Sequence, residues 1–287
     1  MTATTITDTP RHRPLESRSA AAWLLLTPGS LFLILLFVVP IGYVLLLSFT
    51  EPKVSLDHFR RIFTTPLYTS VMINTFRTSL IVTLSCLLLG YPLAYVIARR
   101  NDAVSLIFLT LVGLSFWTGF LVRTYAWLVI LGNRGPVAAT FGVLGLEPPQ
   151  LLFTSFSSTL GMVNILLPYM VFALLSVMKK IDPNHMRAAA SLGAPPTAAF
   201  RTVFLPQSLP GVVNGSVLVF TVCLGFYVTP ILLGTPRDMM ISQLINQQIE
   251  ELLAWGFAAA LAVVLLAVTS FLMILYNRFV GLDRLWG

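Results

Sequence analysis

The chain has 287 residues, of which 56% are hydrophobic and only 10% are charged. Soluble domains carry about 25% charged residues, so this composition excludes an ordinary water-soluble fold and favours a single membrane domain. The net charge of +7 comes from basic residues spread along the chain, without the basic and aromatic surface that binds nucleic acid. The two cysteines, Cys86 and Cys223, lie far apart in apolar stretches, so we interpret them as packing residues.

Six stretches contain no Asp, Glu, Lys or Arg and are long enough to cross a bilayer, which takes about 20 apolar residues of helix. In chain order they are 19–50, 78–98, 103–122, 148–178, 202–236 and 252–277. Arg123 interrupts the third before an apolar continuation to Leu131. The first is too long for the apolar region of a signal peptide. Because backbone groups in lipid must bond to one another, we expect an all-α membrane protein with six transmembrane helices.

The distribution of Lys and Arg predicts the orientation of these helices. If both termini are cytoplasmic, the inner segments hold eleven of the eighteen basic residues and the outer loops hold five. Basic residues are enriched in cytoplasmic loops, so this orientation is favoured. The predicted organisation is a disordered cytoplasmic tail (1–18), a first transmembrane helix (19–50), a periplasmic loop (51–70), a membrane core (71–278) with a cytoplasmic loop at 179–201, and a cytoplasmic tail (279–287).

The loop between the fourth and fifth spans encodes its own short helix. Asp182 is a favourable N-cap and Pro183 suits the first helical position. Gly193 suits the left-handed residue past a helix end, and Pro195 and Pro196 prevent any continuation. We therefore predict a helix of roughly ten residues on the cytoplasmic side, with alanines that allow another surface to approach closely.

This loop resembles the cytoplasmic signature of the membrane subunits of ATP-binding cassette (ABC) importers, which reads Glu-Ala-Ala, then Gly, then a hydrophobic residue and Leu-Pro. The matching residues are Ala188, Ala189, Gly193, Val203, Leu205 and Pro206. Arg187 stands where the family usually has Glu, so no salt bridge is carried over. Further segments, at 122–127, 205–211, 225–230, 239–241 and 255–260, are similar to the spermidine/putrescine permease branch, and together the likeness covers roughly residues 60–275.

The resemblance implies the fold of a type I ABC importer permease in a bacterial inner membrane. Such a subunit pairs with a second permease subunit, here expected to be a different chain, around a central path. An ATPase dimer binds on the cytoplasmic side, and a periplasmic solute-binding protein delivers the substrate. The loop helix is expected to couple the spans to the ATPase through Arg187, Ala188, Ala189, Gly193, Leu205 and Pro206. The expected substrate is a polyamine or another small organic solute.

No phosphate-binding loop of the Gly-x4-Gly-Lys-Ser/Thr type occurs, so we expect ATP hydrolysis in a separate chain and no catalytic residue in this one. We expect no cofactor and no metal site. The candidate residues for the substrate path are Arg123, Tyr125, Trp127, Phe226, Tyr227 and Thr229. Two alternatives stay open for them. Arg123, Tyr125 and Trp127 either line the path or form an interfacial belt with a snorkelling arginine. Phe226, Tyr227 and Thr229 either line the path or pack a kinked helix. At the outer mouth, Glu250 and Glu251 either attract a cation or form a solvated pair.

Two other classes of membrane protein are compared with the importer subunit. A stand-alone secondary transporter or channel commonly carries carboxylates within its spans, whereas all eleven acidic residues here lie in tails, loops or span ends. An intramembrane enzyme needs a nucleophile with a base, or metal ligands, inside a span, and no His lies in any span. Both classes are disfavoured against the importer subunit.

Overall fold

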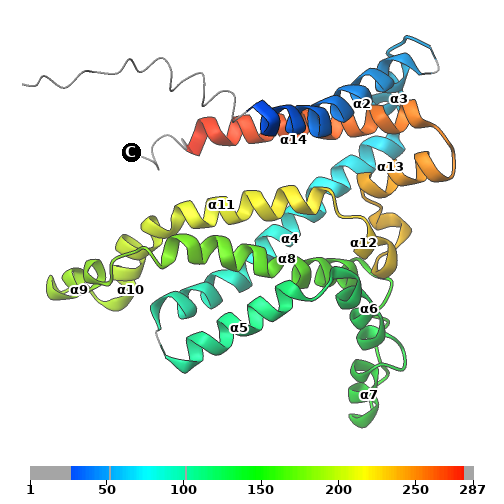
Figure 1. The fold of residues 1–287 in the computed structure, drawn as a ribbon. Helices are drawn as coiled ribbons and strands as arrows, with labels where there is room; N and C mark the ends of the chain where they lie inside the picture. Colours follow the sequence, from blue (N-terminus) through cyan, green and yellow to red (C-terminus); the bar gives the residue numbers. More distant parts are fainter. Residues whose placement is uncertain (1–26, 52, 101, 281–287) are drawn as a thin grey trace, which may run out of the picture.

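The computed structural model describes residues 27–51, 53–100 and 102–280, and every regular element in these ranges is helical (Figure 1). The expected tail 1–18, residues 19–26 of the first span and residues 281–287 lie outside the described residues. The long helices are α2 (Val39–Thr50), α4 (Pro66–Arg99), α5 (Ala103–Trp117), α8 (Ser155–Met178), α11 (Leu205–Leu224) and α14 (Trp255–Val280). The shorter helices are α3 (Asp57–Thr64), α6 (Phe120–Leu131), α7 (Pro136–Val143), α9 (Pro183–Ser191), α10 (Pro196–Ala199), α12 (Val228–Leu233) and α13 (Ile241–Glu250).

Five helices among the described residues are long and apolar enough to span a membrane, and a bent helix pair counted as one span gives the expected six. The first of the five runs over Thr27–Thr50 and includes α2. The second span is longer than expected. Pro66 occupies the first turn of α4, so the helix begins well before residue 78, and its 34 residues extend about 51 Å. Much of the expected outer loop 51–70 is therefore helical, in α3 and the start of α4.

The third span is not the straight crossing predicted over 103–122. α5 ends at Trp117 and α6 begins at Phe120, with a bend of 100° between the two helices. Thr118 closes α5, because its backbone N–H and its hydroxyl both donate to the carbonyl of Leu114, at 3.1 and 2.9 Å. Gly119 then forms the N-cap of α6. The chain thus turns before Arg123, which lies in the first turn of α6.

The fifth span, expected over 202–236, is also interrupted. It consists of α10, a π-helical turn η2 (Phe200–Phe204) and α11, which ends at Leu224. The backbone leaves the helix at Gly225–Tyr227 and becomes helical again in α12. Of the predicted path residues, Phe226 and Tyr227 lie in this break, whereas Thr229 lies within α12.

Helix α8 lies at the centre of the main core and contacts α4, α5, α6, α11 and α12. Met170 of α8 is fully buried between two glycines on neighbouring helices. A Cβ atom on Gly90 of α4 would lie 3.1 Å from the Met170 Cγ, and one on Gly215 of α11 would lie 2.7 Å from its Sδ. Such small residues let membrane helices approach closely. Cys86 and Cys223 are both buried and free in this core, which agrees with their interpretation as packing residues.

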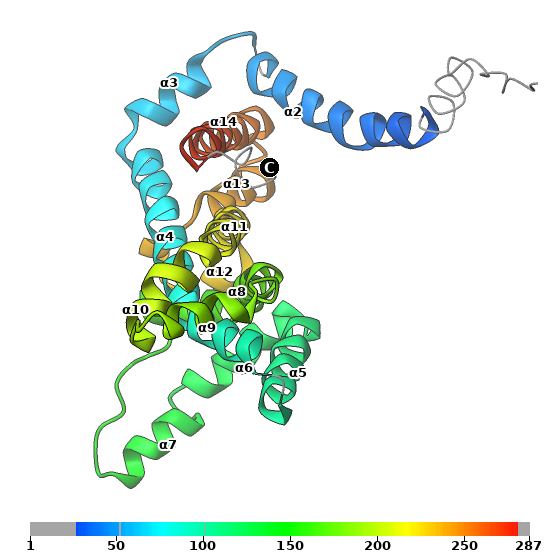
Figure 2. The same ribbon diagram turned by 90° about the vertical axis from the view of Figure 1, so that its left-hand side faces the viewer.

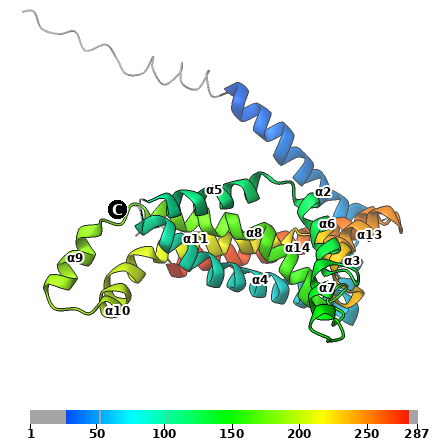
Figure 3. The same cartoon turned by 90° about the horizontal axis from the view of Figure 1, so that it is seen from below.

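A second core joins α3, α4, α13 and α14 at the end of the molecule opposite α9 (Figure 1). Its aromatic centre is Phe257, which lies 5.0 Å from the ring of Tyr68 and has the Arg61 guanidinium 4.8 Å above its own ring. The helix over Thr27–Thr50 contacts α14 and otherwise projects away from the body (Figures 2 and 3). The most apolar window of this helix is 0% buried.

Candidate functional site

The loop helix α9 forms as its capping residues predict. The Asp182 side chain accepts a hydrogen bond from the backbone N–H of Asn184 at 2.8 Å, and Pro183 is the first helical residue. At the other end Gly193 has φ +84°, in the left-handed region that glycine favours. The N–H groups of Gly193 and Ala194 donate to the carbonyls of Ala190 and Ala189, both at 3.0 Å. The helix has nine residues, close to the ten expected.

One side of α9 is held by the membrane domain, and the other side is free. The ring of His185 is hydrogen bonded to Gln207 of α11 at 3.0 Å, and Met186 packs against the main core. Ala188 is exposed and Ala189 is half-buried. Leu192, which follows the helix directly, is 90% exposed. We did not single out Leu192 from the sequence, although an apolar residue next to the glycine of a polar loop was the available signal.

The predicted coupling residues do not all lie on α9. Leu205 and Pro206 begin α11, after the η2 turn that contacts α9. Leu205 is half-buried and Pro206 is exposed. One turn further on, the Ser208 hydroxyl is hydrogen bonded to the Tyr91 hydroxyl of α4 at 2.8 Å. These residues therefore form the root of the loop, where it joins the fifth span, whereas Arg187, Ala188, Ala189 and Gly193 belong to α9 and its end.

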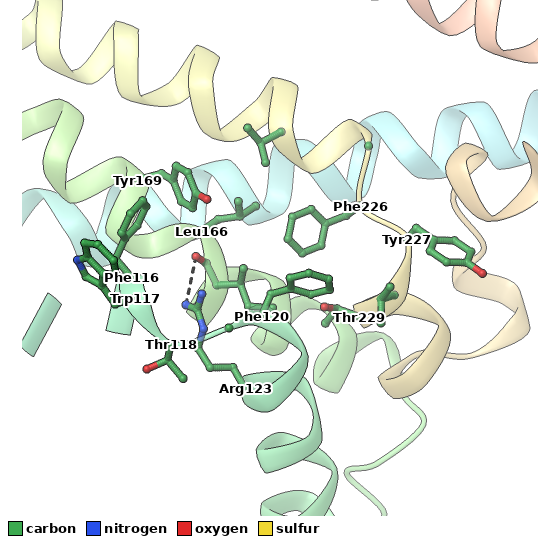
Figure 4. A pocket seen from close by; sticks show the side chains of 15 residues that line it. Phe116, Trp117, Thr118, Phe120, Arg123, Leu166, Tyr169, Phe226, Tyr227 and Thr229 are labelled. Carbon is green, nitrogen blue, oxygen red and sulfur yellow. Dashed lines mark hydrogen bonds between the residues drawn. The ribbon is translucent and has the colours of Figure 1, made fainter. Parts of the chain in front are cut away.

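The two helix breaks meet at one pocket of about 460 Å³ (Figure 4). The break at Thr118–Gly119 forms one part of its wall, and the break at Gly225–Tyr227 forms another. Six aromatic residues from α5, α6, α8 and the α11–α12 break line it, namely Phe116, Trp117, Phe120, Tyr169, Phe226 and Tyr227. Of these, Trp117 is 87% exposed and the Tyr227 ring points away from the pocket (Figure 4). Of the predicted path residues, Arg123, Phe226, Tyr227 and Thr229 line this pocket.

Tyr125 and Trp127 are not among the lining residues, although Phe120 and Arg123 of the same helix are. Tyr125 is 57% exposed and Trp127 is half-buried. Tyr169 of α8, which was not predicted from the sequence, also lines the pocket, across from the α11–α12 break (Figure 4). A tyrosine directly after Pro168 in an apolar span was the available signal.

Arg123 reaches from α6 to the backbone of α8. Its Nη1 donates to the carbonyls of Asn164 and Ile165, at 3.3 and 3.4 Å. Pro168 lacks a backbone N–H, so the carbonyl of Asn164 has no helical partner four residues later. The guanidinium satisfies this carbonyl. Its Nε is buried and has no hydrogen-bond partner among the described residues. Arg123 thus has a clear structural role and also presents a polar atom beside the pocket.

Close contacts between α6, α8 and α12 fix the positions of these helices behind the pocket. The hydroxyls of Thr124 on α6 and Thr229 on α12 lie 3.1 Å apart. A Cβ atom on Gly161 of α8 would lie 2.6 Å from the Leu233 Cδ1 and 2.8 Å from the Thr229 Cγ2, so α12 packs directly on the α8 backbone. This contact leaves no room for a side chain at position 161.

Hydrogen bonds connect the pocket edge to α13. The Ser242 hydroxyl donates to the carbonyl of Phe226. The Asn246 side-chain amide donates to the Tyr227 hydroxyl at 2.8 Å and to Glu250 at 2.9 Å. Glu250 and Glu251 are themselves exposed and lie outside the pocket lining. No group of three or more metal-binding side chains occurs in the described part of the chain.

Comparisons with known proteins agree with this architecture. Residues 23–281 match the family described as "Binding-protein-dependent transport system inner membrane component". The chain is 32% identical over 233 residues to the spermidine/putrescine transport system permease protein PotB of Escherichia coli (strain K12), which covers 80% of this chain and 84% of that protein. It is 27% identical over 223 residues to the molybdenum transport system permease protein ModB of Mycobacterium bovis, which covers 77% of this chain and 83% of that protein.

Solved structures share the fold at lower identity. A bacterial alginate ABC transporter, solved in complex with an alginate pentasaccharide-bound periplasmic protein, aligns with a TM-score of 0.74 and 18% identity, over 94% of this chain and 98% of that chain. The MetNI methionine ABC transporter in an inward-facing conformation aligns with a TM-score of 0.55 and 15% identity, over 72% and 91%. The chain belongs to the binding-protein-dependent transport family and is a multi-pass inner-membrane permease subunit of an ABC importer.

Proposed function

We propose that this subunit forms half of the path for a polyamine of the spermidine or putrescine type, with the aromatic pocket at the two helix breaks as a station on that path. The observation that carries the proposal is this pocket, with Phe116, Phe120, Tyr169 and Phe226 in its lining. Ammonium groups are attracted to the faces of Trp, Tyr and Phe rings by about 0.5–2 kcal/mol each. The names of the PotB relatives point to the same substrate class.

The charges of the pocket suit passage rather than retention. No carboxylate lines it, and Arg123 adds a positive charge at its edge. A polycation is therefore attracted by the rings and opposed by the guanidinium. A site on a transport path must bind firmly enough to admit its substrate and weakly enough to release it. On this proposal, most of the selectivity resides in the periplasmic binding protein that delivers the polyamine.

The proposed coupling runs from α9 to the pocket through one rigid helix. With both termini in the cytoplasm, α9 faces a separate ATPase dimer and offers it Ala188, Leu192 and Gly193, which are exposed. His185 joins α9 to Gln207 of α11. The 20 residues of α11 extend about 30 Å and end at the Gly225–Tyr227 break. A shift of α9 on ATPase closure would thus move the pocket wall. A second permease subunit would complete the path.

Partner recovery and uptake test this proposal. Tagged protein isolated from native membranes in mild detergent should bring an ATPase and a second permease, identified by mass spectrometry. Recovery of a stable chain without either would contradict the importer assembly. In proteoliposomes containing the whole complex and its binding protein, Tyr169→Leu should reduce spermidine uptake about fivefold, the loss of roughly 1 kcal/mol of ring attraction.

Tyr125→Leu is the matched control, because Tyr125 lies on α6 outside the pocket lining. Equal spermidine uptake by the two variants would contradict the proposal that the pocket lies on the path. Absence of spermidine uptake by the unmodified complex, together with strong uptake of an anionic solute, would contradict the polyamine assignment.

A further inference from the structure

Three polar side chains follow one face of α13, because Ser242, Asn246 and Glu250 are each four residues apart. Ser242 and Asn246 are half-buried, and Glu250 is exposed. The first two contact the break in the fifth span. The Ser242 hydroxyl donates to the carbonyl of Phe226, and the Asn246 amide donates to the hydroxyl of Tyr227. This face therefore runs from the edge of the aromatic pocket to the surface of the protein.

Helix α13 gives these side chains a fixed support. Ile241 and Leu244 are buried in the second core, against α3, α4 and α14. The backbone N–H of Ile241 also donates to the hydroxyl of Thr75 on α4, at 2.9 Å. Two polar contacts thus connect the second core to the three residues, Gly225–Tyr227, that interrupt the fifth span.

The Asn246 amide is oriented by two acceptors. Its nitrogen donates to the Tyr227 hydroxyl at 2.8 Å and to the Glu250 carboxylate at 2.9 Å. An amide nitrogen carries two hydrogens, so each acceptor takes one of them. A hydrogen bond to a carboxylate is stronger than one between neutral groups. The contact with Glu250 therefore holds the amide in the orientation that serves Tyr227.

Tyr227 belongs to the pocket lining, but its ring points away from the cavity (Figure 4). Its hydroxyl lies against α13, where Asn246 donates to it. Side chains occupy staggered wells about 120° apart in χ1, so a tyrosine ring released from this contact has other positions available. The aromatic body of a tyrosine favours apolar and aromatic surroundings. The pocket beside it offers them in Phe120 and Phe226.

We propose that Asn246 is a positioning residue for transport, which holds the Tyr227 ring out of the pocket and keeps the pocket open on that side. Without this hydrogen bond the ring turns into the cavity and narrows it. One such bond shifts the balance between two ring positions by about two- to tenfold. The consequence for uptake rests on the proposed function, whereas the position of the ring does not.

The test measures access to the pocket in the whole complex, without ATP or polyamine. Val222 lines the pocket from the last turn of α11, so the variant Val222→Cys places a thiol there. Its rate of labelling by N-ethylmaleimide is measured above the background of the two native cysteines, which are buried. Adding Asn246→Leu should slow the labelling about fivefold. Tyr227→Phe, which keeps the ring and removes the hydroxyl, should slow it to the same extent.

The decisive variant combines Asn246→Leu with Tyr227→Ala. It should restore the labelling rate, because the ring that closes the pocket is gone. In proteoliposomes the same variant should regain part of the spermidine uptake that Asn246→Leu loses. The matched control is Gln247→Leu. This neighbouring amide on α13 also donates to a glutamate four residues later, Glu251 at 3.0 Å, but does not contact the break and lies outside the lining.

Slow labelling in Asn246→Leu that Tyr227→Ala does not restore would mean that Asn246 only supports the fold of α13, and would overturn the proposal. Unchanged labelling in Asn246→Leu, or equal slowing in Gln247→Leu, would overturn it as well. Labelling that is slowed and then restored, with spermidine uptake unchanged throughout, would support the role of Asn246 and contradict instead the place of the pocket on the transport path.

Discussion

Helix α8 and the N-terminal helix over Thr27–Thr50 both have the length and hydropathy of a membrane span, but they occupy opposite environments. The mean hydropathy of α8 is 2.0, and 56% of its most apolar window is buried in the protein. The N-terminal helix is more apolar, at 2.8, yet 0% of its window is buried. In a membrane, high hydropathy marks a helix that enters the bilayer. It does not mark the helix at the centre of the fold.

Small and polar residues make the difference between these two helices. The buried face of α8 includes Ser157, Ser158, Gly161 and Pro168, which bring neighbouring backbones close. In the α2 part of the N-terminal helix, only Ser48 is buried, and its hydroxyl bonds to the carbonyl of Leu45 within the same helix. Lipid competes well for apolar side chains, so packing between membrane helices depends on close approach and hydrogen bonds.

The largest effect expected from this comparison is that of a leucine replacing a glycine in each helix. Gly161→Leu should prevent stable folding, because even a Cβ atom there would lie 2.6 Å from Leu233, and overpacking costs 1–3 kcal/mol or more. Gly42→Leu in the N-terminal helix should be tolerated, because nothing lies within 4 Å of a Cβ atom at Gly42. Size-exclusion profiles and melting temperatures in detergent measure both. Equal losses would show that the N-terminal helix packs as tightly as α8.

A second variant pair tests the hydrogen bond between Arg123 and the proline-freed carbonyl of α8. Arg123→Met should lower the free energy of unfolding by about 1–3 kcal/mol, the cost of an unsatisfied buried carbonyl. Adding Pro168→Ala restores an N–H for Asn164, so the double variant should recover part of this loss. The thermal stabilities of the four proteins form a double-mutant cycle. Additive effects would mean that the two residues do not act on the same carbonyl.

A third prediction concerns Gly193 at the end of α9, where a substitution would change the backbone conformation without a steric clash. A Cβ atom on Gly193 would meet nothing within 4 Å, so substitutions act through its φ of +84°. Gly193→Val should uncouple ATP hydrolysis from uptake while leaving membrane insertion intact. Gly193→Asn should retain most of the coupling, because asparagine tolerates the left-handed region. The ratio of substrate imported to ATP hydrolysed is the measurement. Full coupling in Gly193→Val would argue against a role for this turn.

The smallest effect is expected at the turn between α4 and α5. The backbone N–H of Ser105 and the side chain of Arg100 hold the pKa of Asp102 below its ordinary value of 3.8. A lowered pKa in the folded state contributes stability above the ordinary value, and this stability is lost as the pH falls through the folded pKa. Asp102→Ala should therefore lower the melting temperature slightly at pH 7 and not at all in strong acid. A difference in melting temperature that persists in strong acid would show that the effect does not depend on the charge of Asp102.

Local signals predicted the loop helix well and the pocket only in part. The ends of α9 depend on Asp182, Pro183 and Gly193, which act within one turn and can be recognised from sequence. The pocket instead depends on contacts between residues far apart in sequence, such as those of Arg123 with carbonyls of α8 41 and 42 positions away. Tyr125 and Trp127 were predicted with Arg123 for the path and do not line the pocket, whereas Tyr169 of α8 lines it and was not predicted.

The lengths of α4 and α5 have a consequence for the surrounding lipid. α4 extends about 51 Å, whereas the 15 residues of α5 extend only about 22 Å, against a hydrocarbon core of about 30 Å. Hydrophobic mismatch of this kind is relieved by tilting a long helix and by thinning the bilayer beside a short one. We therefore expect α4 to tilt and the bilayer to thin beside α5, so that acyl-chain length becomes a physical variable of the subunit's activity.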